Sequence, residues 1–346
     1  MKIKNTILIV AGLFTIAACK KEKAETPSPV NPPVSNDITY NAGYVVNGGS
    51  NTISVIDLAT NEVKRTITLP LSWPHHAYIN GNKTKISIGV PGMDLSGGHS
   101  GMTGSGKFII VDAINGNVLD TTSTQLIGHN AIFSPDGTEI WIAQHAMVGY
   151  VQVYDASTYT LKNTIYVQDM PLEVTFSADG LYAFVANSGA WSVSAINIST
   201  KAVTNISVDN EPIGAWPGSN NKMYVDNEAG QSISVIDVNS LTVEETVNLG
   251  FTPGMAAYNS MTNELWVTNG DSAKVVYFMR NGNLWQRAGE IITGNGAHAI
   301  AFTNNGMYAY ITNQLQANVS VINVMSKLKV KDITVGIKPN GIVLKQ

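Results

Sequence analysis

The sequence predicts an all-β fold, a seven-bladed β-propeller closed by pairing its C-terminal strand with the first blade. A unit first seen at residues 44–70 (YVVNGGSNTISVIDLATNEVKRTITLP) returns to the end of the chain. Its alternation of apolar and polar residues is typical of strands with one buried face, and its Asn, Gly and Asp residues indicate tight turns. A unit of this size cannot bury its own apolar face, so its copies must pack against one another.

The repeat period predicts the number of blades. The position that ends the first strand of the unit recurs every 40 to 44 residues, with one longer interval of 55. A period near 40 with about four strands per copy is typical of β-propellers. The long interval places an insertion, Val90–Lys107, in the second copy. The recurring position is occupied by Asn47, Gly89, Gln144, Asn187, Asn227, Asn269 and Asn313.

A further strand links each copy to the next and is expected to be the innermost strand of a blade. Small and β-branched residues dominate it, as a crowded axis requires. The chain therefore starts on the second strand of a blade and ends on a first strand. Pro339–Lys345 should pair beside Tyr44–Asn47 and remove the open sheet edges, which an open β-solenoid would keep. The linking strands are Pro74–Tyr78, Gly128–Phe133, Pro171–Phe176, Pro212–Trp216, Pro253–Tyr258, Ala297–Phe302 and Pro339–Leu344.

Residues 1–18 are predicted to be a lipoprotein signal peptide, outside the fold. Two lysines precede an apolar run that is too short to span a membrane as a mature helix. The run ends in Ala-Ala-Cys19, and Cys19 is the only cysteine of the chain. This stretch resembles a bacterial lipobox, which implies that Cys19 is lipidated; a secretory signal with an incidental cysteine is the alternative.

Residues 19–37 are expected to form the lipidated cysteine and a flexible, proline-rich tether to the propeller at 38–346. Lys20 and Lys21 follow the cysteine where a signal for retention in the inner membrane would carry Asp. This favours an outer-membrane lipoprotein, with the periplasmic and surface leaflets both open.

Three repeats carry a family resemblance. The phrases YVVN at 44–47, YVDN at 224–227 and WVTN at 266–269, each followed by Ser-Val-Ile-Asp or a related phrase, resemble the YVTN family of β-propeller repeats. The resemblance covers residues 44–346 and implies the fold. It implies no single function, because such propellers include surface-layer-like proteins, binding lipoproteins and enzyme domains. With the lipobox, the chain also resembles surface lipoproteins of Bacteroidetes, some of which capture nutrients such as corrinoids.

Composition restricts the partners. The net charge is −4 and only 13% of the residues are charged, which excludes the basic surface that nucleic acids require. The lipid is expected to be the only membrane contact. We expect a monomeric propeller that binds a small molecule or an envelope protein.

All six histidines are predicted to lie on one face of the propeller. The inner strands start on this face, and the loops between second and third strands return to it. Blade one alone separates blades two and seven, so the histidines at the inner-strand starts should converge at one sector of the channel mouth. Those four are His75, His76, His129 and His298; His145 ends a second strand, and His99 lies in the insertion.

Converging imidazoles predict a metal or ligand site, because imidazole is the commonest metal-binding side chain. We take His75, His76, His129 and His298 as metal ligands, with His145 as a further candidate. Glu173, on blade four, is a candidate ligand or a hydrogen-bond acceptor for a ligating histidine. His99 and Met102 of the insertion are a candidate cover. The metal would be copper or zinc, and a set of His and Met would favour copper.

Three functions remain open from the sequence. The first is a cell-envelope lipoprotein that binds a ligand or partner through the histidine face. The second is a metal-dependent redox protein or enzyme; the adjacent histidine pair has a loose likeness to nitrous oxide reductase, whose cysteine-bearing copper domain this chain lacks. The third is a purely structural surface propeller, with histidines that bind only water in a polar channel. No motif of a hydrolase or metalloprotease is present, so no catalytic residue is assigned and an enzyme is not favoured.

Overall fold

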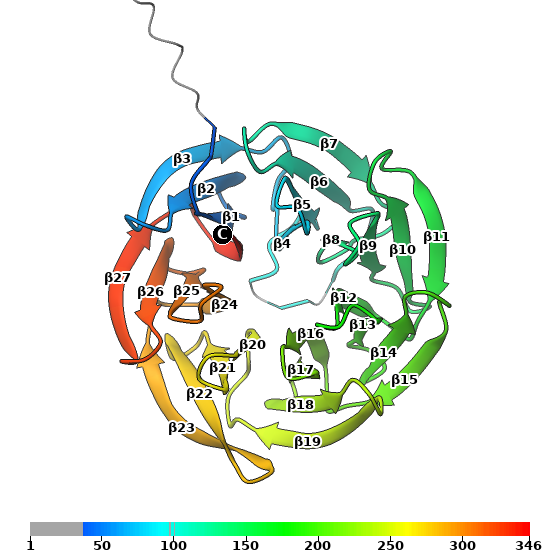
Figure 1. Ribbon diagram of the computed structural model, residues 1–346. Coiled ribbons are helices and arrows are strands. Elements are labelled where there is room, and N and C mark those ends of the chain that lie inside the picture. Colours follow the sequence, from blue (N-terminus) through cyan, green and yellow to red (C-terminus); the bar gives the residue numbers. More distant parts are fainter. Residues whose placement is uncertain (1–36, 97, 100) are drawn as a thin grey trace, which may run out of the picture. The chain divides into compact units, whose positions relative to one another are not determined.

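The computed structural model describes residues 37–96, 98, 99 and 101–346. This part of the chain forms one compact unit of 28 strands in seven four-stranded sheets, the blades of a propeller (Figure 1). The all-β, seven-bladed prediction is confirmed. The predicted signal peptide, Cys19 and all but the last residue of the tether lie outside the described residues, so these predictions stay as they are.

The blades follow one another in chain order, and each consists of four strands from the axis outward. Blade one is β28 (Pro339–Lys345), β1 (Ala42–Asn47), β2 (Thr52–Asp57) and β3 (Glu62–Thr68). Blade two is β4 (Ala77–Ile79), β5 (Lys85–Val90), β6 (Lys107–Asp112) and β7 (Val118–Ser123). Blade three is β8 (Ile132–Phe133), β9 (Glu139–Gln144), β10 (Tyr150–Asp155) and β11 (Leu161–Tyr166). Blade four is β12 (Pro171–Phe176), β13 (Tyr182–Asn187), β14 (Ser192–Asn197) and β15 (Val203–Ser207).

The remaining three blades have the same order. Blade five is β16 (Pro212–Gly218), β17 (Lys222–Asn227), β18 (Ser232–Asp237) and β19 (Thr242–Asn248). Blade six is β20 (Ala256–Asn259), β21 (Glu264–Asn269), β22 (Lys274–Asn281) and β23 (Leu284–Ile292). Blade seven is β24 (Ala297–Phe302), β25 (Tyr308–Asn313), β26 (Asn318–Asn323) and β27 (Leu328–Thr334).

The two ends of the propeller chain share one sheet, as predicted. β28 pairs antiparallel with β1, with Ala42 opposite Lys345 and Val45 opposite Ile342. β28 also contacts the inner strands of blades seven and two, which closes the ring. Pairing the last strand with the first removes the free edges that an open array of blades would expose.

The core lies between neighbouring blades. In blades one and five the second and third strands are almost wholly buried, whereas the outer strands alternate between exposed and more buried positions. This matches the two-residue period of a strand that has one face on a neighbouring blade and the other in solvent. Large side chains such as Tyr44, Trp141, Tyr224 and Trp266 fill the space between sheets and are 0% exposed.

The recurring Asn has a structural function. In four blades its Nδ2 donates at 3.0 Å to the Oγ of a serine seven residues later, across the turn between the second and third strands. The pairs are Asn47–Ser54, Asn187–Ser194, Asn227–Ser234 and Asn313–Ser320. The recurring Asp acts similarly in the next turn: Oδ1 of Asp57 accepts from the backbone N–H of Ala59 at 2.8 Å. These repeated residues therefore stabilise turns.

The inner strands of blades two, three and six begin later than predicted, and in blade six pairing starts at Ala256. Regular pairing begins only at Ala77 in blade two and at Ile132 in blade three, after the histidines rather than at them. The backbone still follows β5, because Gly89 accepts from the N–H of His75 and donates to the carbonyl of His76. Successive side chains of a regular strand point to opposite faces. Leaving the regular register allows His75 and His76 to point to the same site.

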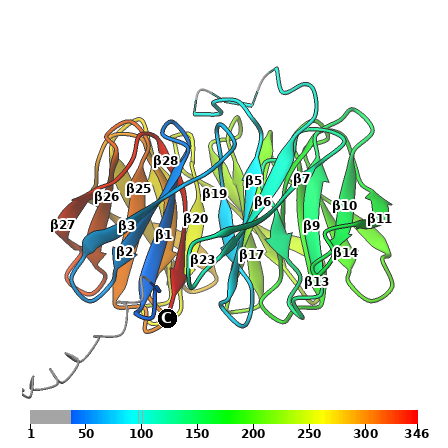
Figure 2. The same ribbon diagram turned by 90° about the horizontal axis from the view of Figure 1, so that it is seen from above.

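The insertion between β5 and β6 extends from one end of the ring, opposite the C-terminus (Figure 2). Its Asp94 forms an ion pair with Lys338 of blade one, and the Lys338 ammonium also donates to Ser96 Oγ at 2.7 Å. Among the described residues, no helix has the length and apolarity needed to cross a membrane.

Candidate functional site

Four imidazoles meet at the end of the channel on the insertion side, as predicted. The His75 and His76 rings are stacked, with centroids 4.5 Å apart and 20° between their planes. The His129 ring centroid lies 4.2 Å from that of His75, and the His298 centroid lies 5.4 Å from that of His76. We call His75, His76, His129 and His298, together with His99 of the insertion, the histidine cluster.

Two glycines allow the blades to approach closely at this cluster. A Cβ atom on Gly89 would lie 2.7 Å from the carbonyl oxygen of His129, and one on Gly341 would lie 2.8 Å from Cα of His76. Neither position tolerates a side chain without movement of a histidine backbone. The Asn of the repeat is replaced by Gly89 because blade three packs directly on that position.

Glu173 orients two members of the cluster. Its Oε1 accepts from Nδ1–H of His129 at 2.5 Å and from Nδ1–H of His76 at 2.9 Å. The carboxylate is 1% exposed, and its Oε2 accepts from the Tyr78 hydroxyl at 3.3 Å. A hydrogen on Nδ1 leaves the lone pair of each neutral ring on Nε2. Nε2 of His76 is buried without a hydrogen-bond partner in the described structure. The predicted role of Glu173 as an acceptor for these histidines agrees with this geometry.

His298 is oriented from the other side. Its Nδ1 donates to the carbonyl oxygen of Asn340 at 3.3 Å, which leaves Nε2 with the lone pair. Glu173 and His298 both lie where an inner strand shifts its register against the next strand. The local irregularity at the start of these strands directs the two side chains to the axis.

His99 of the insertion joins the cluster from above. Its Nε2 lies 3.2 Å from Nε2 of His129, and its Nδ1 lies 3.8 Å from Oε2 of Glu228. Met102 packs among apolar side chains. It is 5% exposed in an apolar group with Leu95 of the insertion and Leu172 of blade four, so it holds the insertion on the ring. The predicted cover thus contains one imidazole of the cluster and one packing residue.

His145 lies beside the cluster. Burial lowers the pKa of His145, a backbone hydrogen bond at Pro171 opposes this, and the nearby His129 lowers it further. Among the described residues no ring contact links the His145 imidazole to another histidine. It remains a candidate by proximity alone.

Burial disfavours the charged form of His75, His99, His129 and His298. It lowers the pKa of His99 and of His298 to about 3, with further contributions from His129 and His76 respectively. The pKa of His75 is also lowered well below its usual value by burial and by His129. Burial alone would raise the pKa of Glu173, but the imidazoles of His76 and His129 outweigh it and lower that pKa. His75 and His298 are therefore neutral imidazoles with a free lone pair near the Glu173 carboxylate, the protonation state in which metals are bound.

Two overlapping sets of ligand atoms have the spacing of a metal site. One nitrogen each of His75, His76 and His298 lie within 4.8 Å of one another, and so do ligand atoms of His76, His129 and Glu173. Tetrahedral zinc with bonds of about 2.0–2.1 Å places its nitrogens about 3.3 Å apart, so small ring rotations bring the first set together. In the second set the carboxylate already holds the Nδ1 hydrogens. The first set therefore fits a metal ion better, with Glu173 as the acceptor behind it.

A polar cavity of about 450 Å³ adjoins the cluster on the insertion side. His298 forms part of its wall, together with Glu228, Asp271 and Gln314. Burial, and then Glu211, raise the pKa of Glu228 to about 7. The cavity gives a small polar molecule access to the cluster.

Asp226 is a site residue that sequence reasoning missed. It is 0% exposed, its Oδ1 accepts from Nε1–H of Trp216 at 2.6 Å, and its Oδ2 has no partner among the described residues. Burial, and then Glu228, raise its pKa well above the usual range. A signal was present: the repeat position of Asp226 is filled by Val46, Thr268 and Thr312 in other blades.

No protein-family profile and no curated protein matches the sequence. Solved structures show the fold. A functionally unknown protein from Desulfotomaculum acetoxidans has a TM-score of 0.71 at 16% identity, over 88% of this chain and 98% of that one. The periplasmic gluconolactonase of Pseudomonas aeruginosa has a TM-score of 0.70 at 17% identity, over 88% and 99%.

A putative 6-phosphogluconolactonase from Bacteroides fragilis is similar to the same degree. It has a TM-score of 0.70 at 16% identity, over 91% of this chain and 100% of that one. At these identities the likeness shows the propeller fold alone. The YVTN resemblance still rests only on the sequence repeats.

Proposed function

We propose that this protein is a YVTN-type lipoprotein of the cell envelope whose histidine cluster binds one transition-metal ion, copper or zinc. The observation that carries the proposal is the group of ring nitrogens from His75, His76 and His298 within 4.8 Å of one another, behind which Glu173 holds Nδ1 of His76. A carboxylate–histidine pair of this kind orients metal-binding imidazoles in many proteins and increases their basicity.

Two unpaired ring nitrogens support a bound metal ion over histidines that bind only water. Nδ1 of His75 and Nε2 of His76 are buried without hydrogen-bond partners in the described structure, an arrangement that costs about 1–3 kcal/mol for each group. A bound cation would satisfy these lone pairs and compensate the charge of Glu173. Imidazole ligands suit copper and zinc, and in the general order of affinities copper(II) binds more tightly.

The chain from residue 19 onward, carrying Cys19→Ser so that no detergent is required, provides the test. After loading with copper(II) or zinc(II) and desalting, elemental analysis should give one equivalent of metal. His76→Asn should abolish retention of the metal, while His145→Asn, on the same face but outside the ring contacts, should keep it. The proposal fails if both variants retain equal metal or if the unchanged protein retains none.

The polar cavity beside His298 supports a ligand-binding role for the same site. Three histidine ligands leave a coordination position open, as in catalytic zinc sites. We propose that a small polar ligand reaches the metal through this cavity. Added imidazole should shift the visible spectrum of the copper-loaded protein, and a spectrum that imidazole leaves unchanged would count against an open position.

A further inference from the structure

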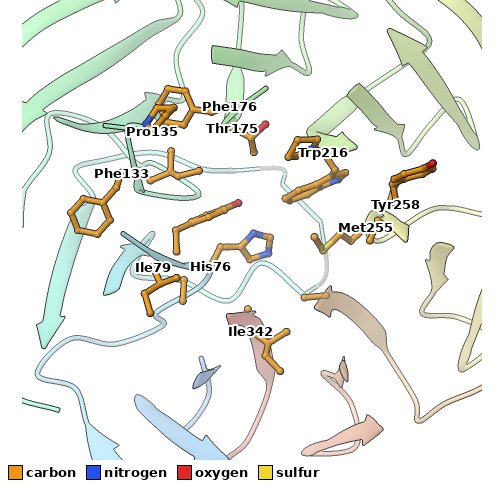
Figure 3. Close-up of a pocket in the computed structure, with 18 residues that line it drawn as sticks. His76, Ile79, Phe133, Pro135, Thr175, Phe176, Trp216, Met255, Tyr258 and Ile342 are labelled. Atoms are coloured by element: carbon orange, nitrogen blue, oxygen red, sulfur yellow. The ribbon is translucent and has the colours of Figure 1, made fainter. Parts of the chain in front are cut away.

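A second cavity, of about 420 Å³, lies in the central channel beyond the histidine cluster (Figure 3). Inner strands of all seven blades contribute to its wall, so it is a feature of the closed ring rather than of one blade. Its size is within the usual range for small-molecule sites, about 300–1,000 Å³.

One end of the cavity lies beside the histidine cluster, and the other end reaches exposed residues. Buried His76 and Ala299 lie in its wall at the end nearer the cluster. Two exposed prolines lie in the wall at the other end. Pro135 follows β8, and Pro217 lies near the end of β16. Because the inner strands start at the histidine face, the opening is on the opposite face, where Lys345 ends β28. A molecule entering there does not pass the insertion.

The lining is mainly apolar and includes several aromatic rings. Phe133, Phe176, Trp216 and Tyr258 contribute rings and Met255 a thioether, and Figure 3 shows these side chains around the space with His76. The described lining residues include no Asp, Glu, Lys or Arg. A charged ligand would therefore lose its hydration without gaining a counter-charge, whereas an aromatic ligand would find faces and edges to pack against.

Two of the aromatic side chains are held by contacts outside the cavity. Nε1–H of Trp216 donates at 2.6 Å to buried Asp226, which is not among the lining residues. The Tyr258 ring stacks on Tyr224 with centroids 5.8 Å apart and planes at 10°. Side chains fixed before a ligand arrives lose little entropy on binding, which favours affinity. A buried Asp that serves to hold an indole at the cavity wall is difficult to explain as packing alone.

We propose that the central channel binds one small, uncharged, largely aromatic molecule, which enters from the face opposite the insertion. The proposal is independent of the metal. Because His76 belongs both to the cavity wall and to the histidine cluster, an occupant lies beside the imidazole that Glu173 orients.

N-phenyl-1-naphthylamine, an uncharged aromatic dye, tests the proposal by fluorescence titration of the metal-free chain from residue 19 carrying Cys19→Ser. We expect saturable binding of one dye per chain, with energy transfer from tryptophan. 8-Anilinonaphthalene-1-sulfonate, which adds a charge to a related ring system, should bind at least about ten-fold more weakly because the channel offers its sulfonate no counter-charge.

Two variants locate the dye. Ile132→Asp places a carboxylate on a half-buried wall position and should weaken binding of the uncharged dye at least about ten-fold. Ile292→Asp is the matched control, because Ile292 is 68% exposed on outer strand β23, and it should leave binding unchanged. If Ile132→Asp does not fold, judged by its circular dichroism, Tyr258→Ala provides the same test with an expected loss of several-fold. Equal affinities for the wall and control variants, or a stoichiometry above one, would overturn the proposal.

Discussion

Oε1 of Glu173 accepts a hydrogen bond from Nδ1 of His129 at 2.5 Å, across the boundary between blades four and three. The two residues are 44 positions apart in the chain, one repeat period. The same oxygen accepts from His76 of blade two at 2.9 Å. One carboxylate thus holds imidazoles from two neighbouring blades, and the blade spacing of the propeller makes this geometry available.

Replacing that carboxylate should weaken metal binding. In Glu173→Gln an uncharged amide takes the place of the acceptor behind His76 and His129, and loss of such a partner typically lowers metal affinity about 10–100-fold. Competition with a chromophoric chelator measures the change. Glu62→Gln, at an exposed carboxylate on outer strand β3, is the control and should have no effect. An unchanged affinity in Glu173→Gln would show that the carboxylate does not orient metal ligands.

The metal-free protein should lose stability as the pH falls from 6.5 towards 3. The folded pKa of His298 is lowered to about 3, so over that range the unfolded chain binds a proton that the folded one does not. Each such histidine adds up to about 1.4 kcal/mol per pH unit to the slope of the unfolding free energy. Urea unfolding at several pH values should show a shallower slope in His298→Gln.

Glu228 should act in the opposite direction in the same experiment. Its folded pKa is raised to about 7, so between its unfolded value of 4.5 and pH 7 the folded state binds the extra proton. That contribution to stability is complete below pH 4.5 and is lost as the pH rises to 7. Glu228→Gln should therefore steepen the loss of stability on acidification; a shallower slope would contradict the assignment.

Asp226→Asn should stabilise the protein at pH 7. The pKa of Asp226 is raised well above 3.8 by burial, so the folded state keeps a proton that the unfolded chain releases as the pH rises. The amide keeps the acceptor for Trp216 and has no such penalty. The difference in unfolding free energy should be small at pH 3 and grow with pH by up to about 1.4 kcal/mol per unit. Parallel curves for the two proteins would mean that Asp226 is ionised in the fold.

Gly89→Ala should damage both stability and metal binding. The new Cβ would lie 2.7 Å from the His129 carbonyl, and relief of such overpacking typically costs about 1–3 kcal/mol. Gly81→Ala, where the nearest atom is 3.9 Å from the new Cβ, is the control and should unfold at the same urea concentration as the unchanged protein. A Gly89→Ala protein with normal stability and metal content would argue against the tight approach of blade three.

Cys19 should be the site of lipid attachment. In cells fed radiolabelled palmitate, the unchanged protein should be labelled and sediment with membranes, and Cys19→Ser should be neither. Adding Ser28→Cys to Cys19→Ser restores a thiol at a position without the preceding Ala-Ala and should not restore the label. Labelling of that double variant would show that any nearby cysteine suffices.

The sequence by itself determined the architecture of this protein. Period, strand alternation and turn residues predicted the seven blades, the closing pair of strands and the shared face of the histidines, because each depends on local rules repeated along the chain. The turn residues of the repeat, such as Asp57, have the expected role in the structure. Glu173 and His129 were found because both depart from the apolar pattern of the inner strands.

Only the tertiary structure decided how those side chains meet. The register shifts at His298 and Glu173, the irregular backbone at His75 and His76, and the close approach at Gly89 depend on contacts between blades that are distant in the chain. The same contacts placed Met102 in an apolar group, separated His145 from the rings, and revealed Asp226 behind Trp216. Packing between blades is non-local and depends on differences of a few tenths of an ångström, which repeat patterns do not encode.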